Sequence, residues 1–199
     1  MTPEKLSYDK SFSPALLGMW IFLATECLLF SALLFTLFLY RHQYAADFGA
    51  GTRHLSLFVG TLNTAILLTS SFTMALAVRD SESEHFKRAK KLMWTTAGLG
   101  LVFIVLKFQE YAHHYQEGLV PALNWFPDRL SLPHLPLFFV LYYFTTGLHA
   151  VHLMIGIVLI SLAKPKNKEL TENLGLYWHF VDVVWIFLFP LLYLMGRTS

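Results

Sequence analysis

Five apolar runs divide this chain, and each is long enough to cross a lipid bilayer as a helix. A hydrocarbon core about 30 Å thick is spanned by roughly 20 apolar helical residues. Inside lipid every backbone polar group must find its partner within the protein, so only helices and closed barrels can span. The sequence therefore predicts an all-α fold, a polytopic bundle of five transmembrane helices forming a single transmembrane domain over residues 1–199. We expect these helices at about 14–40, 55–78, 92–112, 136–163 and 174–195.

The composition excludes several other classes of protein. Of the 199 residues, 55% are hydrophobic and only 14% are charged, whereas soluble domains carry about 25% charged residues. The net charge is +2 and the basic residues are dispersed, which gives no indication of nucleic-acid binding. Cys27 is the single cysteine and lies in an apolar run, so neither an internal disulfide nor a cysteine-ligated metal is indicated. The run at 14–40 is too long for the core of a signal peptide, and we expect it to be retained.

The polar links between the runs differ in charge from one side to the other. Because lysine and arginine accumulate on the cytoplasmic side of membrane proteins, we expect the N-terminus in the cytoplasm and the C-terminus outside. Between the first two helices, on the external side, we expect a turn containing Gly49 and Gly51. The basic residues on the predicted cytoplasmic side are Lys5, Lys10, Arg79, Lys87, Arg88, Lys90, Lys91, Lys164, Lys166 and Lys168, against Arg41, Arg53, Arg129 and Arg197 on the other side.

Ionisable side chains on three different runs share one depth. Counting about 1.5 Å per helical residue places Glu26, His152 and Asp182 roughly 15–18 Å from the cytoplasmic ends. His149 lies one turn from His152, and His179 lies one turn from Asp182. A charged group at the centre of a membrane helix costs about 2.5–3.5 kcal/mol and should face protein. The simplest interpretation is a buried polar network, in which the two carboxylates accept hydrogen bonds from the imidazoles.

The same residues leave two other functions open. Carboxylates and imidazoles are ordinary metal ligands, so an autonomous membrane metalloenzyme would use Glu26, His149, His152 and Asp182. However, two histidines spaced as His149 and His152 are a weak pattern without further ligands. Intramembrane carboxylates also mark proton paths, which would make Glu26 the proton-coupled group of a small transporter. No inverted repeat or broken helix supports that transporter.

A second polar group lies nearer the predicted external side. Lys107 and Glu110 are one helical turn apart and can neutralise each other, with His113 and His114 following. These residues are either an internal ion pair at the end of a span or a contact for a lipid head group or another subunit. Trp178 and Trp185 share one stripe with Asp182 on the last helix, and we count them as possible lipid or subunit contacts.

Three sequence blocks on separate spans carry a family resemblance. They are GMWIF at 18–22 followed by Glu26, TGLHAVH at 146–152, and YWHFVDVVW at 177–185; Glu110 and Tyr111 form a weaker block. With these blocks in this order, the chain resembles subunit III of the haem-copper respiratory oxidases (the cytochrome c oxidase subunit 3 family) over nearly its full length. The resemblance is to the five-helix bacterial type, because the two additional N-terminal helices of the mitochondrial type have no counterpart here.

The resemblance implies a non-catalytic accessory subunit that binds no metal itself. Haem and copper would belong to the partner subunits I and II, and this chain would steady subunit I and support proton uptake while that complex reduces O2 and translocates protons. Glu26 matches the family's carbodiimide-reactive carboxylate. A bound phospholipid and a place in the bacterial cytoplasmic membrane are also implied, although another subunit would have to complete the lipid cleft. Quinol oxidases and the related subunit of nitric oxide reductase remain alternatives to a cytochrome c oxidase.

Overall fold

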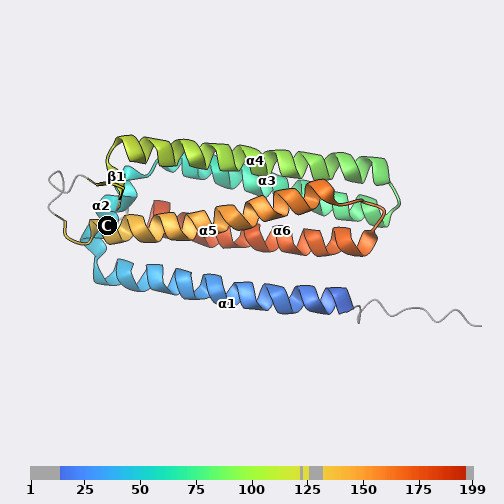
Figure 1. Ribbon diagram of the computed structural model, residues 1–199, viewed down its shortest axis with the longest axis horizontal. Coiled ribbons are helices and arrows are strands. Elements are labelled where there is room, and N and C mark those ends of the chain that lie inside the picture. The colour runs from blue at the N-terminus through green and yellow to red at the C-terminus, as the bar shows by residue number, and fades with distance from the viewer. Residues whose placement is uncertain (1–13, 122, 126–131, 196–199) are drawn as a thin grey trace, which may run out of the picture.

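The computed structural model describes residues 14–121, 123–125 and 132–195. Five of its helices are long and apolar enough to cross a membrane, which confirms the predicted all-α polytopic fold. These helices lie side by side along the long axis of the molecule (Figure 1). They are α1 (Pro14–Gln43), α3 (Leu57–Glu82), α4 (Phe86–Gln116), α5 (Leu135–Leu162) and α6 (Lys168–Phe189), the last continued by the π-helical turn Pro190–Leu194. The basic residues Lys5, Lys10, Arg129 and Arg197 lie outside the described residues.

A short helix, α2 (Ala45–His54), replaces the turn that we predicted around Gly49 and Gly51. That prediction was wrong because the glycine at position 51 serves close packing rather than a turn. A side chain at Gly51 would overlap the ring of Phe138 on α5. The carboxylate of Asp47 also accepts a hydrogen bond of 2.9 Å from the backbone N–H of His134. These contacts attach α2 to the start of α5.

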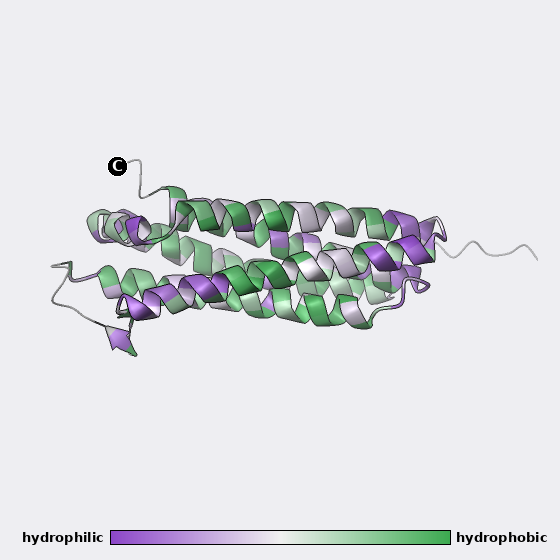
Figure 2. Cartoon of the chain, turned by 90° about the horizontal axis from the view of Figure 1, so that it is seen from above, coloured by the Kyte–Doolittle hydropathy of each residue, from purple (hydrophilic) through white to green (hydrophobic). Residues whose placement is uncertain are grey.

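Two helices begin earlier than their apolar runs. α4 begins at Phe86 and α6 begins at Lys168, so charged turns precede both membrane segments. Hydropathy marks where a segment enters lipid, whereas a helix continues for as long as its backbone hydrogen bonds do. Figure 2 shows this arrangement as hydrophobic colour along the middle of the bundle and hydrophilic colour towards its ends.

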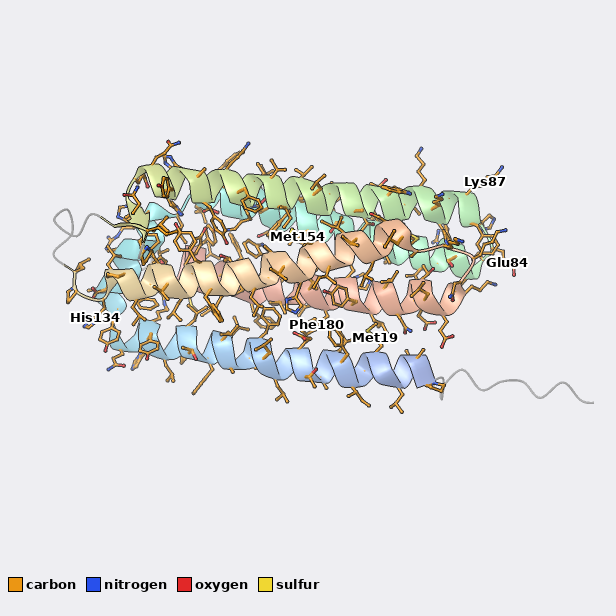
Figure 3. All side chains as sticks on the ribbon, in the orientation of Figure 1. Met19, Glu84, Lys87, His134, Met154 and Phe180 are labelled. Atoms are coloured by element: carbon orange, nitrogen blue, oxygen red, sulfur yellow. The ribbon has the colours of Figure 1, made fainter. Side chains whose placement is uncertain are left out.

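Ion pairs join the helices at the end of the bundle that carries most lysines and arginines. Arg88 contacts Asp80 at 3.2 Å, and Lys168 contacts Glu84 at 2.9 Å. The Lys168 ammonium lowers the pKa of the Glu84 carboxyl. Figure 3 places Glu84 and Lys87 at this end and His134 at the opposite end. The opposite end also carries the two-residue strands β1 (Leu119–Val120) and β2 (Asn124–Trp125), paired antiparallel.

The helices differ greatly in how much protein surrounds them. In the apolar segment of α6, 50% of the residues are buried, against 17% in that of α1. α6 packs against α3, α5 and α1, whereas α1 meets the bundle mainly along α6. Figure 3 shows Met19 of α1 and Phe180 of α6 in the space between these two helices. α6 is therefore the central helix of the bundle, and α1 lies at its side (Figure 1).

Candidate functional site: polar groups within the bundle

Glu26 and His152 form the direct link between predicted site residues. The Nε2 atom of His152 lies 3.0 Å from the Glu26 carboxylate, which joins α5 to α1. The other ring nitrogen, Nδ1, is 2.9 Å from the backbone carbonyl of Leu148, so it carries the proton in that contact. The edge of this imidazole also meets the ring of Phe30. Both side chains are mostly buried, at a depth where hydrogen bonds to water are not available.

His149 faces away from this pair, although it lies on the same helix. Its imidazole is fully buried between the rings of Phe103 on α4 and Trp185 on α6. Neither ring nitrogen has a hydrogen-bond partner among the described residues. His149 is therefore an aromatic packing element of the core, and it does not join Glu26.

Asp182 and His179 also remain separate from the Glu26–His152 pair. His179 is 2.7 Å from the hydroxyl of Ser71 on α3 through its Nδ1 atom. Asp182 is buried, and the same Ser71 lies beside its carboxylate. Of the residues predicted to form one network, the structure joins Glu26 to His152 and places His149, His179 and Asp182 outside that pair. Equal depth did not imply contact, because the side chains leave their helices in different directions.

Lys107 and Glu110 form an internal ion pair, which is one of the two alternatives that their spacing left open. The ammonium of Lys107 donates to the Glu110 carboxylate at 2.8 Å, and both residues are buried on α4. Lys107 also donates to the hydroxyls of Tyr142 at 2.9 Å and Tyr193 at 2.8 Å. Tyr193 in turn donates to the same carboxylate. One buried cluster thus connects α4, α5 and the end of α6.

The two tyrosines of this cluster were not predicted from the sequence. A lysine within an apolar run requires several acceptors, and tyrosines on neighbouring spans were the available candidates. The π-helical turn at Pro190–Leu194 contains Tyr193. Proline has no N–H to donate to the preceding turn, which favours an irregular helix at this point. Wide turns of this kind occur often at functional positions.

Trp178 and Trp185 were counted as possible lipid or subunit contacts, and the structure buries both within this chain, with side chains 0% and 1% exposed. Both indole N–H groups donate to α3, from Trp178 to Ser70 at 3.1 Å and from Trp185 to Thr64 at 3.0 Å. The stripe on α6 is a docking face as expected, but its partner is α3 of the same chain. Lys107 is equally inaccessible, whereas Glu110 lines a cavity.

Comparison with known proteins gives a consistent result over most of the chain. Cytochrome c oxidase subunit 3 of Alkalihalophilus pseudofirmus is 33% identical over 192 residues, covering 90% of this chain and 86% of the relative. Quinol oxidase subunit 3 of Bacillus subtilis is 36% identical over 195 residues, covering 91% and 87%. The chain belongs to the cytochrome c oxidase subunit III family. Another member, cytochrome c oxidase subunit 3 of Thermostichus vulcanus, is 32% identical over 191 residues, covering 91% and 87%.

The family model for cytochrome c oxidase subunit III matches residues 135–197. Within the described residues this match covers α5, α6 and the π-helical turn. His149, His152 and Asp182 all lie in it, together with the two core tryptophans. Glu26 of α1, which contacts His152, and Phe103 of α4, which contacts His149, lie outside the match. Lys107 of α4, which donates to Tyr193, also lies outside it.

The geometry of this subunit III chain also bears on the metalloenzyme alternative. In the part of the chain that the structure describes, no three of its histidine, cysteine, aspartate or glutamate side chains converge as metal ligands. Glu26 and His152 come together as one pair, while His149 and Asp182 lie apart from them. The residues named for that alternative therefore do not form a common site.

Proposed function

We propose that this chain is the accessory subunit III of a bacterial haem-copper terminal oxidase, without a redox centre of its own. The complex would reduce O2 and translocate protons in aerobic respiration, with haem and copper in its partner subunits I and II. The observation that carries the proposal is similarity to named third subunits over about nine-tenths of the chain. The buried pairs Glu26–His152 and Lys107–Glu110 support it, because both hold this chain together. The first joins α1 to α5, and the second belongs to the cluster that joins α4, α5 and the end of α6.

The electron donor is proposed to be cytochrome c, with a quinol oxidase as the second candidate. The second candidate is retained because relatives of both names have similar identity and coverage, 33% over 90% of this chain and 36% over 91%. Donor specificity belongs to the other subunits of such a complex. We therefore expect the donor to be identified by assay of the complex.

The groove between α1 and α6 is proposed to hold an acyl chain of a phospholipid. It has a volume of about 420 Å³, and its lining includes Phe30, Leu34, Phe180 and Phe187. An apolar groove of this kind matches a lipid tail in chemistry. A neighbouring subunit would close its open side, and α1 has apolar side chains available for that contact.

We further propose that the chain lies in the bacterial cytoplasmic membrane with its N-terminus in the cytoplasm. Basic side chains gather around the link between α3 and α4 (83–85) and the link between α5 and α6 (163–167). They support this orientation through the positive-inside rule. Support of proton uptake on the cytoplasmic side is proposed from membership of the family. Its test is the number of protons pumped per electron, measured in vesicles with and without this chain.

Purification through a tag on this chain tests the accessory role. In mild detergent, we expect a large haem-containing partner to copurify and the visible spectrum to show its haem. After the chain is stripped away and isolated, all colour and all stoichiometric metal should remain with the partner. A lone chain that retained metal would contradict the proposal and favour the metalloenzyme.

A second test uses the carboxylate at the centre of α6. Replacement of Asp182 by alanine removes a buried polar group from the most enclosed helix. We expect less of this chain in the purified complex, with the haem spectrum of the remaining complex unchanged. A lost haem signal at full occupancy of the chain would contradict the accessory role.

A further inference from the structure

The seam between α3 and α6 carries a polar atom on the outside of the bundle. The two helices pack against each other, and the Nδ1 atom of His179 lies 2.7 Å from the Ser71 hydroxyl. Both side chains are only half-buried. The second ring nitrogen of His179, Nε2, has no hydrogen-bond partner among the described residues, and it is not one of the polar atoms that those residues enclose completely. His179 is therefore bonded on its inner side and open on its outer side.

This open nitrogen lies within the apolar part of the bundle. His179 is roughly 8 Å inside the apolar run that begins at Leu174, and an imidazole cannot reach the lipid head groups from there as a long lysine side chain can. The exposed side chains beside it are apolar, namely Leu68, Phe72, Val183 and Ile186. Lipid tails form no hydrogen bonds, so a polar atom at this depth is unfavourable unless protein covers it.

The contacts behind His179 determine what a partner has to provide. The Ser71 hydroxyl lies beside both the Nδ1 atom of His179 and the buried carboxyl group of Asp182. A hydroxyl holds one proton, so its orientation decides which ring nitrogen of a neutral His179 carries the ring proton. A hydroxyl or amide side chain suits either case, because it can donate to Nε2 or accept from it. Such side chains form hydrogen bonds between helices in membranes.

The seam adjoins the apolar groove between α1 and α6. Val183 lies one turn from His179 and lines that groove together with Cys27 and Phe30 of α1. A helix that lay along the exposed face of α6 would close the groove and cover His179 at the same time. A lipid tail could fill the groove, but it has no group that bonds to an imidazole. A protein helix provides both an apolar surface and one directed hydrogen bond.

We propose that the α3–α6 seam is the surface on which a transmembrane helix of a partner subunit docks. That helix is apolar and carries one hydroxyl or amide side chain at the depth of His179, where it bonds to Nε2. The inference rests on the proposed function in one respect, which is that this chain is a subunit of a larger complex. The seam consists of Leu68, Ser71, Phe72, His179, Val183 and Ile186.

Photocrosslinking in the membranes of cells that produce the whole complex tests the proposal. The photoreactive residue p-benzoylphenylalanine replaces Leu68 on α3 or Val183 on α6, one position at a time. Leu101 on α4 and Val158 on α5 are the matched controls, because each has the same residue type and a similar exposure. We expect both seam positions to form an adduct with another transmembrane subunit, and we expect the controls to form no protein adduct.

Two replacements of His179 separate its inner contact from its outer one. The amide of His179→Asn occupies the place of Nδ1 and can still bond to Ser71, whereas the longer His179→Gln places its amide where Nε2 was. In a detergent titration of the complex, His179→Asn should retain the partner about threefold more weakly, because an interhelical hydrogen bond is lost. His179→Gln should retain it as the unmodified chain does. The reverse order would show that His179 acts only within this chain and would overturn its part in docking.

The outcomes also distinguish this proposal from the accessory role. Seam positions that form no protein adduct, that react only with lipid or with a second copy of this chain, or that react no more than the controls would overturn the docking surface. If a haem-containing partner still copurified in that case, the accessory role would stand. Seam adducts with a membrane protein that lacks haem, without copurification of a haem protein, would support the docking surface and contradict the accessory role.

Discussion

At the residue scale, the polar groups inside the bundle are organised as local pairs and one cluster. Glu26 is bonded to His152, and His179 is bonded to Ser71. Lys107 has three oxygen partners, which is the number of its N–H donors. Burial of an ion pair is favourable only when its remaining hydrogen-bonding capacity is used in this way. The geometry thus explains how a lysine can lie within an apolar helix.

Replacement of Lys107 by methionine should destabilise the protein by about 3–5 kcal/mol, because the Glu110 carboxylate remains buried without its cation. The measurement is the thermal unfolding midpoint of the purified protein. The double variant Lys107→Met/Glu110→Gln removes both charges and should recover most of the loss. Equal midpoints for the single and double variants would show that the unpaired charge is not the cause.

At the scale of elements, close approach of α4, α5 and α6 depends on glycines that face the core tryptophan. A Cβ atom at Gly100 would lie 2.8 Å from the Trp178 ring, and one at Gly156 would lie 3.1 Å from it. Small residues allow membrane helices to pack closely, and packing is the main attraction between helices in lipid. α1 lacks such an intimate interface and depends more on individual polar contacts.

Gly100→Ala should therefore cost about 1–3 kcal/mol through overpacking against Trp178. A Cβ atom at Gly98, on the same helix, would meet no atom of another helix within 4 Å. Gly98→Ala is the control and should be neutral or slightly stabilising, since alanine is the better helix former. Thermal unfolding midpoints of the two variants provide the comparison. A control that lost as much stability as Gly100→Ala would indicate a general effect of glycine replacement.

Glu26→Ala should loosen α1 from the bundle. It removes a contact to His152 of a class worth about 1.5–3 kcal/mol when one partner is charged. The Arg41 contact to the Leu191 carbonyl remains at the other end of the helix. The measurement is the rate of disulfide formation between Cys27 and the substitution Val183→Cys, since both positions line the same groove. This rate should fall.

The neighbouring substitution Thr25→Ala is the control for α1. The Thr25 hydroxyl donates only to its own helix, to the carbonyl of Phe22 at 2.7 Å. It should leave the rate of disulfide formation unchanged. An unchanged rate in Glu26→Ala would show that apolar packing alone holds α1.

At the scale of the whole molecule, the two ends of the bundle differ in charge and in architecture. One end has short links, the ion pairs Arg88–Asp80 and Lys168–Glu84, and most of the basic side chains. The other end has α2 and the two short strands (Figure 1). This asymmetry suits a protein that is inserted in one direction only.

Cysteine labelling should reveal that orientation. In a Cys27→Ser background, Ser83→Cys should react with a membrane-impermeant maleimide only from the cytoplasmic side. Ala46→Cys on α2 should react only from the outside, and both positions are exposed. The opposite pattern would reverse the proposed orientation, and it would leave the helix packing unaffected.

Much of the fold and little of the site geometry could be predicted from the sequence. The five spans were predictable because lipid requires about 20 apolar residues for each crossing. The Lys107–Glu110 pair was predictable because both residues lie on one helix at a spacing of one turn. Contacts between helices were not predictable in this way. Depth along a helix says nothing of the direction in which a side chain leaves it, and His149 and His152 face different neighbours for that reason.

The amino-acid sequence by itself determined the number of spans, their helical character, the charge difference between the ends and the family resemblance. These properties depend on local composition and on motifs within single segments. Only the tertiary structure decided that Trp178 and Trp185 bond to α3, that Tyr142 and Tyr193 complete the shell of Lys107, and that α2 is a helix. Such contacts depend on the relative rotation and closeness of helices, which the packing of all side chains sets together.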